Sequence, residues 1–292
     1  MVWGVVTLTF FLVRVLPGDP AALSLGVSAD AETLAKLRHA MGLDTPLVVQ
    51  YVIFLRDAVR GDFGQSVYMS QSSTTLFLVK LPATLELALT ALLLSMVVAL
   101  PLGMYAAVRV NTARDALIGL FTLTAQSMPN FWVGIMLILV FSQTLRLLPT
   151  FGRGTWQQTV LPAVAVALPM VALVARLVRT GMLDNLQEDY VRTARAKGLP
   201  ERAVVNRHIV KNMLIPVVTV VGLQFGSLLA GAVIVEIVFS WPGVGQLTVD
   251  AILRRDYPVV AAAVFFISLA FVLVNLAVDI AYAYLDPRIR YR

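Results

Sequence analysis

The chain has no cysteine, only two histidines and only four lysines among its 292 residues. The missing cysteines exclude disulfides, thiolate metal sites and cysteine nucleophiles. The phosphate loop that binds ATP in motor proteins needs Gly-Lys followed by Ser or Thr. No lysine here follows a glycine, because Ala or Val precedes each one. A chain of this kind does not hydrolyse ATP through such a loop.

Charge is also scarce, and its distribution is more informative than its amount. Only 14% of the residues are charged and 59% are apolar, whereas about a quarter of a soluble domain is charged. A helix of about 20 apolar residues crosses the hydrocarbon core of a bilayer. Uncharged runs of this length separate the charged clusters, and five of them in one soluble protein would be very improbable. They predict spanning helices at 87–108, 116–145, 154–175, 212–235 and 257–278.

A sixth apolar segment, residues 1–16, opens the chain but is short. About 15 residues at 1.5 Å each reach only part of the way across a bilayer. The segment lacks the basic start and the small-residue cleavage site of a signal peptide. We therefore expect a partial first transmembrane helix, truncated at its start. The predicted fold class is an all-α polytopic membrane protein with six transmembrane helices and a small extracytoplasmic helical region.

Lysine and arginine predict the orientation, because the loops richest in them stay in the cytoplasm. One set of loops, at 109–115, 176–212 and 286–292, carries 13 basic residues in about 50 positions. The other set, at 17–82, 146–160 and 236–258, carries 9 in about 105. The first set is predicted to be cytoplasmic, together with both termini.

The organisation that follows has four parts. After residues 1–16 comes an extracytoplasmic region, 17–82, in which the pattern predicts short helices at 31–40 and 46–60. A membrane core of five helices, 83–285, contains a cytoplasmic loop at 184–211, and residues 286–292 form a cytoplasmic tail. His39 and His208 then lie on opposite sides of the membrane, so they cannot share a metal ion.

Polar side chains within the apolar runs are candidates for function, because burying them in a membrane is costly. Glu86 and Asp279 lie near helix ends, where they can reach the interface, and amides such as Asn275 can bond between helices. The sharper hypothesis concerns four side chains near the membrane interior. Pro129 should kink the third helix beside three of them. We expect the four to line a translocation path: Gln126, Ser127, Asn130 and Gln224.

A face of small residues on the fifth helix begins with Gly222 and Gly226. Small residues let helix backbones approach closely. Packing within the chain and contact with another subunit both remain open.

The cytoplasmic loop from Asp184 to Lys211 has the pattern of two helices joined by a turn. Asp184 or Asn185 can cap the first helix, and Gly198 can end it. Pro200 suits the first turn of a second helix. A basic surface loop attracted to anionic lipid would explain the arginines. A compact unit with small residues at its turn also favours docking of a separate ATP-hydrolysing protein.

The loop resembles the "EAA" loop of ATP-binding-cassette importer permeases, in which Glu-Ala-Ala is followed by three residues and a glycine. Here residues 192–194 (Arg-Thr-Ala) occupy the triplet and Gly198 the glycine. Arg192 replaces the Glu of the pattern, so the contacts of that Glu do not carry over.

The departures resemble one branch, the peptide/nickel permeases of the dipeptide type. The matching segments run in order through the chain: 16–20, 42–46 with Gln50 and Tyr51, 61–66, 81–87, 190–198, 207–216, 231–236, 241–245, 255–258, 275–279 and 286–288. Members usually begin with some 15–20 further residues, in keeping with the short first helix. The resemblance implies that the loop couples the chain to an ATPase through Tyr190, Arg192, Thr193, Ala194, Arg195, Lys197, Gly198, Glu201, Arg202, Arg207 and His208.

The resemblance further implies a permease subunit of an ATP-driven importer for peptides or a related small solute, working by alternating access. Its expected partners are a second homologous permease, two ATP-binding-cassette ATPases, an extracytoplasmic binding protein and the lipid bilayer of a bacterial or archaeal cytoplasmic membrane, and not nucleic acid. ATP and magnesium would be used by the ATPase subunits, and this chain would be no enzyme and hold no cofactor or metal. The alternatives are a secondary transporter driven by an ion gradient, which would want paired intramembrane acids, and a membrane scaffold that moves nothing.

Overall fold

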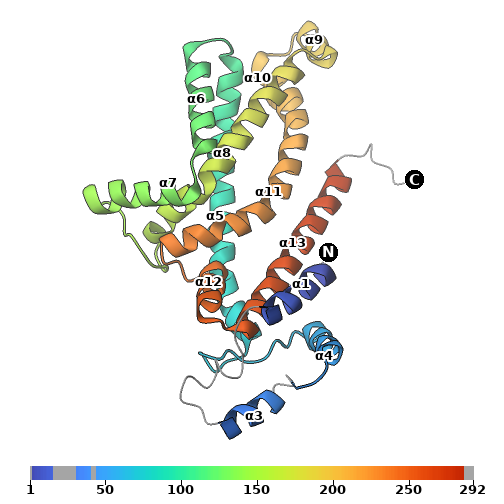
Figure 1. Ribbon diagram of the computed structural model, residues 1–292. Helices are drawn as coiled ribbons and strands as arrows, with labels where there is room; N and C mark the ends of the chain where they lie inside the picture. The colour runs from blue at the N-terminus through green and yellow to red at the C-terminus, as the bar shows by residue number, and fades with distance from the viewer. Residues whose placement is uncertain (1, 16–30, 41–43, 286–292) are drawn as a thin grey trace. The chain divides into compact units, whose positions relative to one another are not determined.

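The computed structural model describes residues 2–15, 31–40 and 44–285, and the motif matches at 16–20, 42–43 and 286–288 lie outside them. The described residues are helical apart from turns and one isolated bridge between Gln65 and Ser72. Figure 1 shows the elements, which are α1 (Val2–Val15), α3 (Ala31–Ala40), α4 (Leu47–Val59), α5 (Ser73–Val108), α6 (Ala113–Ser127), α7 (Asn130–Leu137), η1 (Ile138–Thr144), α8 (Trp156–Leu186), α9 (Asp189–Ala196), α10 (Glu201–Ala203), η2 (Val204–Ile209), α11 (Val210–Val238), α12 (Val244–Arg254) and α13 (Tyr257–Leu285).

The all-α class is confirmed, and so are the two short helices predicted at 31–40 and 46–60, which are α3 and α4. Three described helices are individually long and apolar enough to cross a membrane: α5, α8 and α13. Two bent pairs raise the number to as many as five if each pair counts as one span. The predicted number of six is therefore not reached among the described residues. Helix α1 has 14 residues, which at about 1.5 Å each fall short of the roughly 30 Å hydrocarbon core.

The expectation of one kinked span at 116–145 underestimates the break at Pro129. Helices α6 and α7–η1 meet there at 105°. A proline disfavours helical backbone at the residue before it, and Met128 accordingly has extended angles, φ −82° and ψ 128°. Pro129 is itself extended and caps α7. The chain thus leaves the direction of α6 completely, giving a broken span or a re-entrant segment in place of a through-going helix.

The chain divides into two compact units, and each is described by itself. One unit consists of residues 1–82 and 242–273, and the other of residues 83–241 and 274–292. The boundary at residues 82 and 83 coincides with the predicted end of the extracytoplasmic region. The segment 242–273, predicted as part of the membrane core, forms its compact unit with that region instead.

In the first unit, aromatic rings and one buried acid hold the segments together. Phe10 of α1 packs on Phe54 of α4 with ring centroids 5.4 Å apart, and Phe63 packs on Phe265 of α13 at 5.0 Å. Asp256 is 4% exposed and accepts a hydrogen bond from the Ser66 hydroxyl. Two of the sequence motifs, 61–66 and 255–258, therefore meet in space.

In the second unit, α8 is the central helix and packs against α6, α7 and α11 (Figure 1). A continuous apolar core surrounds it, with Val174 and Val178 fully buried. Gly103 of α5 lies so close to α8 that a Cβ built on it would stand 2.5 Å from the Ala175 carbonyl oxygen. Gly222 of α11 likewise faces Val278 of α13, where a Cβ would meet the Val278 side chain at 2.7 Å. The close approach expected of Gly222 is thus a contact within the chain.

Candidate functional site

The loop at 184–211 has the predicted two-helix form with a shifted start. Helix α8 runs on to Leu186, so Asp184 and Asn185 belong to its last turn. The prediction that one of them caps the next helix is therefore wrong. Helix α9 instead begins at Asp189 with Glu188 in the capping position. The reason is that no proline follows Arg176 in α8, so the helix continues past the charged boundary at which the charge pattern predicts the end of the span.

Gly198 ends the first helix as predicted. Its φ is +78°, in the left-handed region that disfavours any residue with a Cβ, and a Cβ there would meet nothing within 4 Å. Across this turn the guanidinium of Arg195 donates two hydrogen bonds to Glu201, Nη2 to Oε1 at 2.6 Å and Nε to Oε2 at 3.1 Å. These hydrogen bonds hold the pKa of the Glu201 carboxyl below its usual value and raise that of Arg195. A bidentate ion pair therefore joins the two arms of the turn.

The loop is anchored to the second unit by apolar contacts. Val191 and Ala194 of α9 are buried in the same core as Val204 and Ile209 of η2. The hydroxyl of Tyr190 donates to the Asn185 side chain at the end of α8. Helix α9 is therefore fixed against its neighbours, and movement of the loop would be transmitted to α8 and α11.

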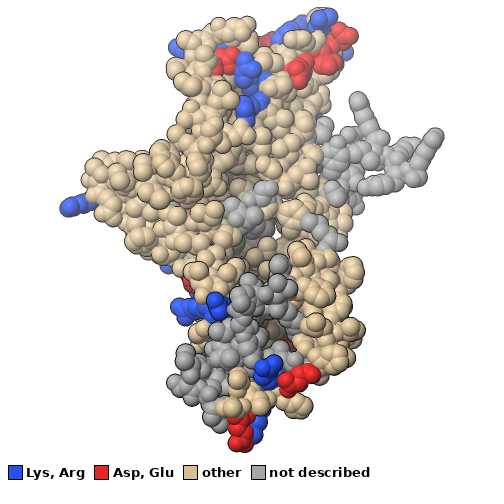
Figure 2. Space-filling view, viewed as in Figure 1, with Lys and Arg blue, Asp and Glu red and all other residues tan. Residues whose placement is uncertain are grey.

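The opposite face of the loop is charged and exposed. Figure 2 shows positive and negative side chains gathered over α9 and α10. Of the residues predicted to couple to an ATPase, Tyr190 and His208 are half-buried and Ala194 is buried, while the others are exposed: Arg192, Thr193, Arg195, Lys197, Gly198, Glu201, Arg202 and Arg207. Leu199, which the pattern did not single out, is a 40% exposed apolar side chain at the turn. The sequence signal for it was a leucine directly after the glycine of a turn, within an otherwise charged segment.

Three of the four polar residues predicted for a translocation path line one cavity. Gln126 comes from the end of α6, Asn130 from the start of α7 and Gln224 from the middle of α11. The break at Pro129 is what brings the first two to the same wall. The cavity has a volume of about 170 Å³, and its remaining lining is apolar: Val166, Pro169, Met170, Leu173 and Leu228.

Ser127, the fourth predicted residue, does not line this cavity. Its hydroxyl donates to the carbonyl of Leu123 at 2.9 Å, within its own helix. A serine one position from Gln126 projects in another direction because successive helical residues are rotated by about 100°. Adjacency in sequence therefore did not mean adjacency at the cavity.

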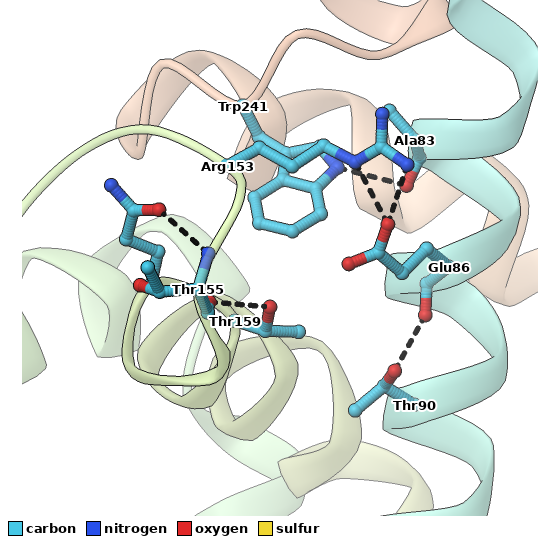
Figure 3. Close-up of polar contacts among 8 residues, drawn as sticks. Ala83, Glu86, Thr90, Arg153, Thr155, Thr159 and Trp241 are labelled. Carbon is cyan, nitrogen blue, oxygen red and sulfur yellow. Dashed lines mark hydrogen bonds and ion pairs between the residues drawn. The ribbon is translucent and has the colours of Figure 1, made fainter.

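A polar cluster in the first half of α5 contains Glu86. A second acid in this region is buried, which the charge pattern did not indicate. Figure 3 shows the guanidinium of Arg153 donating to Glu86, from Nη2 at 2.6 Å and Nε at 2.8 Å, and the Trp241 indole donating to the Ala83 carbonyl at 2.8 Å. Nearby in sequence, Glu236 is fully buried and accepts a hydrogen bond from Thr84 at 2.6 Å.

The first turn of α6 is also tied to α8 by an ion pair. Both oxygens of Asp115 accept hydrogen bonds from Arg179, each at 2.7 Å, and Asp115 Oδ2 also accepts from the backbone of Asn111. Arg179, one of the basic residues that predicted the cytoplasmic side, therefore also holds two helices together. Among the described residues, no group of His, Cys, Asp and Glu could hold a metal ion. The side chain of Asp279 lies outside the described ones.

The chain combines long apolar helices, a broken span, a polar cavity and an anchored two-helix loop. These are features of a transport protein, and the comparisons with known proteins lead to the same class. Residues 99–291 match the family "Binding-protein-dependent transport system inner membrane component", and residues 1–88 match its N-terminal family. The chain belongs to this family, within its peptide/nickel branch of the dipeptide type. It is therefore a permease subunit of an ATP-binding-cassette importer, a membrane subunit without enzymatic activity, and not a secondary transporter.

The glutathione transport system permease protein GsiC of Salmonella typhimurium LT2 is 42% identical over 288 residues, which cover 99% of this chain and 94% of that one. The protein of the same name from Escherichia coli K12 is 43% identical over 285 residues, covering 98% and 93%. Importers of this kind combine a permease with ATPase and substrate-binding components, and the ATPases use the ATP.

Solved structures share the fold at low sequence identity. An inward-facing form of the MetNI methionine ABC transporter matches with a TM-score of 0.63 at 16% identity, covering 72% of this chain and 96% of that one. An amino acid ABC transporter with histidines matches with a TM-score of 0.52 at 15% identity, covering 74% and 95%. The helical arrangement is thus that of importer membrane subunits.

Proposed function

We propose that this permease moves a short peptide, glutathione or a peptide of similar size, across the cytoplasmic membrane. The observation that carries the choice of cargo is the 42–43% identity to glutathione permeases over nearly the whole chain. The cavity contributes a second argument, since an uncharged, amide-lined wall suits a peptide. The path is formed with a second homologous permease, and Gln126, Asn130 and Gln224 line this chain's share of it.

The loop 184–211 is the docking element for an ATPase subunit in this proposal. Two ATPases bind on the cytoplasmic side, where both termini also lie, and a binding protein delivers the cargo on the other side. Closure of the ATPase dimer on ATP moves the loop, which is joined to the cavity wall through α8. Leu173 of the wall lies 13 residues before the end of that helix at Leu186, about 20 Å at 1.5 Å per residue. ATP and loaded binding protein shift the conformational equilibrium only by their differential affinity for its two states.

Uptake into vesicles tests the transport function. The complex is reconstituted with its ATPases and binding protein, and radiolabelled glutathione and L-alanyl-L-alanine are offered with ATP inside or outside. We expect accumulation only with ATP on the ATPase side, unaffected by collapse of ion gradients. A complex that assembles and hydrolyses ATP but accumulates neither peptide would contradict the proposed cargo, and one that accumulates no solute would favour a scaffold.

Substitution at the turn tests the docking role. Leu199→Glu places a charge on the exposed apolar side chain, and Gly198→Glu adds bulk at the turn. Both should abolish co-purification of the ATPase and stimulation of its activity by loaded binding protein. Val110→Glu is the matched control, because Val110 is 39% exposed against 40% for Leu199 and lies in a different cytoplasmic loop. Intact coupling in both turn variants would refute the docking role.

A further inference from the structure

We propose that the cavity between α6, α7, α8 and α11 binds a peptide bond of the cargo through its three carboxamides, and that it selects for neutral amides over charged groups. This inference rests on the proposed function and names what the path recognises. The eight residues comprise three carboxamides and five apolar side chains, and none is ionisable.

The absence of charge from this lining limits what it can hold. An ionised carboxylate, ammonium or metal chelate gives up part of its hydration when it enters even a partly open cavity, and it regains that loss only where a counter-charge is present. No lining residue supplies a counter-charge. The cavity therefore favours a neutral segment of the cargo over a charged one.

Carboxamides add the second requirement, which is hydrogen bonding in both directions. Each carboxamide side chain has two N–H donors and a carbonyl acceptor, so it can pair with both the C=O and the single N–H of a peptide bond. Gln126, Asn130 and Gln224 come from three separate helices and converge on one space. Because they converge, they can form hydrogen bonds with one amide group of the cargo from more than one side. Purely apolar cargo would leave these groups unpaired, which costs binding free energy.

The size of the cavity agrees with a part of a peptide. Its volume of about 170 Å³ is below the roughly 300–1,000 Å³ of pockets that enclose a whole small ligand. A peptide unit with a small side chain fits such a space, whereas a whole tripeptide must extend beyond it. The charged ends of the cargo then lie outside this wall. Recognition of the backbone alone tolerates different side chains along the same path.

The test compares each peptide with an analogue in which an ester oxygen replaces the amide N–H. Reconstituted wild-type complex is offered glutathione and its cysteinyl–glycine ester analogue, or L-alanyl-L-alanine and its ester analogue. The measured quantity is the ratio of the maximal uptake rates for amide and ester. The same ratio is measured for Gln224→Leu and Gln126→Leu, which remove hydrogen bonding at similar side-chain length. Because the binding protein is unchanged, its own preference cancels between wild type and variant.

We expect each variant to lower the amide-to-ester ratio by about three- to tenfold, the loss of about one hydrogen bond. Gln143→Leu is the matched control, since Gln143 is an exposed glutamine of η1 that does not line the cavity, and it should leave the ratio unchanged. Gln126 is exposed, so Gln126→Leu serves if Gln224→Leu does not assemble with the ATPases.

Three other outcomes overturn the inference and separate it from the proposed function. If the variants slow amide and ester equally, the cavity is on the path but does not recognise the amide. If they leave both uptake rates unchanged, the cavity has no part in transport, while ATP-driven peptide uptake still stands. If wild type accumulates no peptide at all, the proposed cargo is wrong, and the inference is wrong with it.

Discussion

At the scale of single residues, buried polar contacts explain motifs that the sequence could only match. The indole of Trp241 is fully buried and donates to the Ala83 carbonyl, which joins the 241–245 motif to the 81–87 motif. Thr84 in that second motif donates to the buried Glu236. A buried donor or acceptor that loses its partner costs about 1–3 kcal/mol. These residues are therefore expected to be structural rather than to touch the cargo.

Trp241→Phe should lower the stability of the purified chain by about 1–3 kcal/mol, through the lost hydrogen bond and the smaller buried ring. The measurement is the apparent Tm in detergent at a fixed heating rate. Trp156→Phe is the control, because Trp156 is 71% exposed. Equal Tm values for the two variants would show that the burial of Trp241 contributes nothing.

At the scale of elements, local sequence rules described the turn of the loop 184–211 well and its attachment poorly. Gly198 and Pro200 act locally, through backbone angles, so their roles were predictable. The burial of Val191 and Ala194 depends on which side of α9 meets η2. Ala194, one of the residues that the resemblance implies for coupling to an ATPase, is buried. Short helices of mixed polarity do not reveal from sequence which neighbour covers them.

The ion pair between Arg195 and Glu201 should restrict the turn at Gly198. Glu201→Gln should speed amide hydrogen exchange of residues 196–202 by about two- to threefold, in line with roughly 0.5 kcal/mol for an exposed pair. Asp189→Asn is the control, because Asp189 pairs with Arg192 within α9 and not across the turn. Unchanged exchange in Glu201→Gln would mean that the glycine turn holds its shape without the pair.

The same pair sets the expected pH dependence. The hydrogen bonds from Arg195 lower the pKa of Glu201, so the pair stabilises the turn at any pH above the ordinary Glu value of roughly 4.3. That contribution is lost as the pH falls through the lowered pKa. Arg195, with its raised pKa, stays charged throughout the acidic and neutral range. Exchange in the turn, corrected for its intrinsic pH dependence, should be constant from about pH 5 to 8 and rise only in stronger acid.

Close helix packing around α8 gives a further prediction at this scale. Gly103→Ala should destabilise the chain by about 1–3 kcal/mol, since a Cβ would collide with the Ala175 carbonyl at 2.5 Å. Gly119→Ala provides the control in α6, because nothing lies within 4 Å of its Cβ position. Alanine is favoured over glycine in helices, so that variant should be at least as stable. Detergent unfolding midpoints compare the two.

At the scale of the whole molecule, the orientation predicted from charge awaits a direct measurement. The chain has no cysteine, so a single introduced cysteine is a clean reporter. Lys197→Cys should react with a membrane-impermeant maleimide only in inverted vesicles, and Arg146→Cys only in intact cells or right-side-out vesicles. Both positions are exposed, so burial does not prevent labelling. The reverse pattern would overturn the assignment of both termini to the cytoplasm.

The sequence by itself determined the membrane class, the helical content, the turn at Gly198 and the importer family, because these follow from composition, charge-free runs and local motifs. Only the tertiary structure decided that the third span breaks by 105° at Pro129, that 242–273 forms a compact unit with 1–82, and that Gln126, Asn130 and Gln224 share a cavity without Ser127. The physical reason is that these outcomes depend on the direction in which a helix leaves a break and on which helices then pack together. A one-dimensional pattern records hydrophobicity and spacing but not those directions.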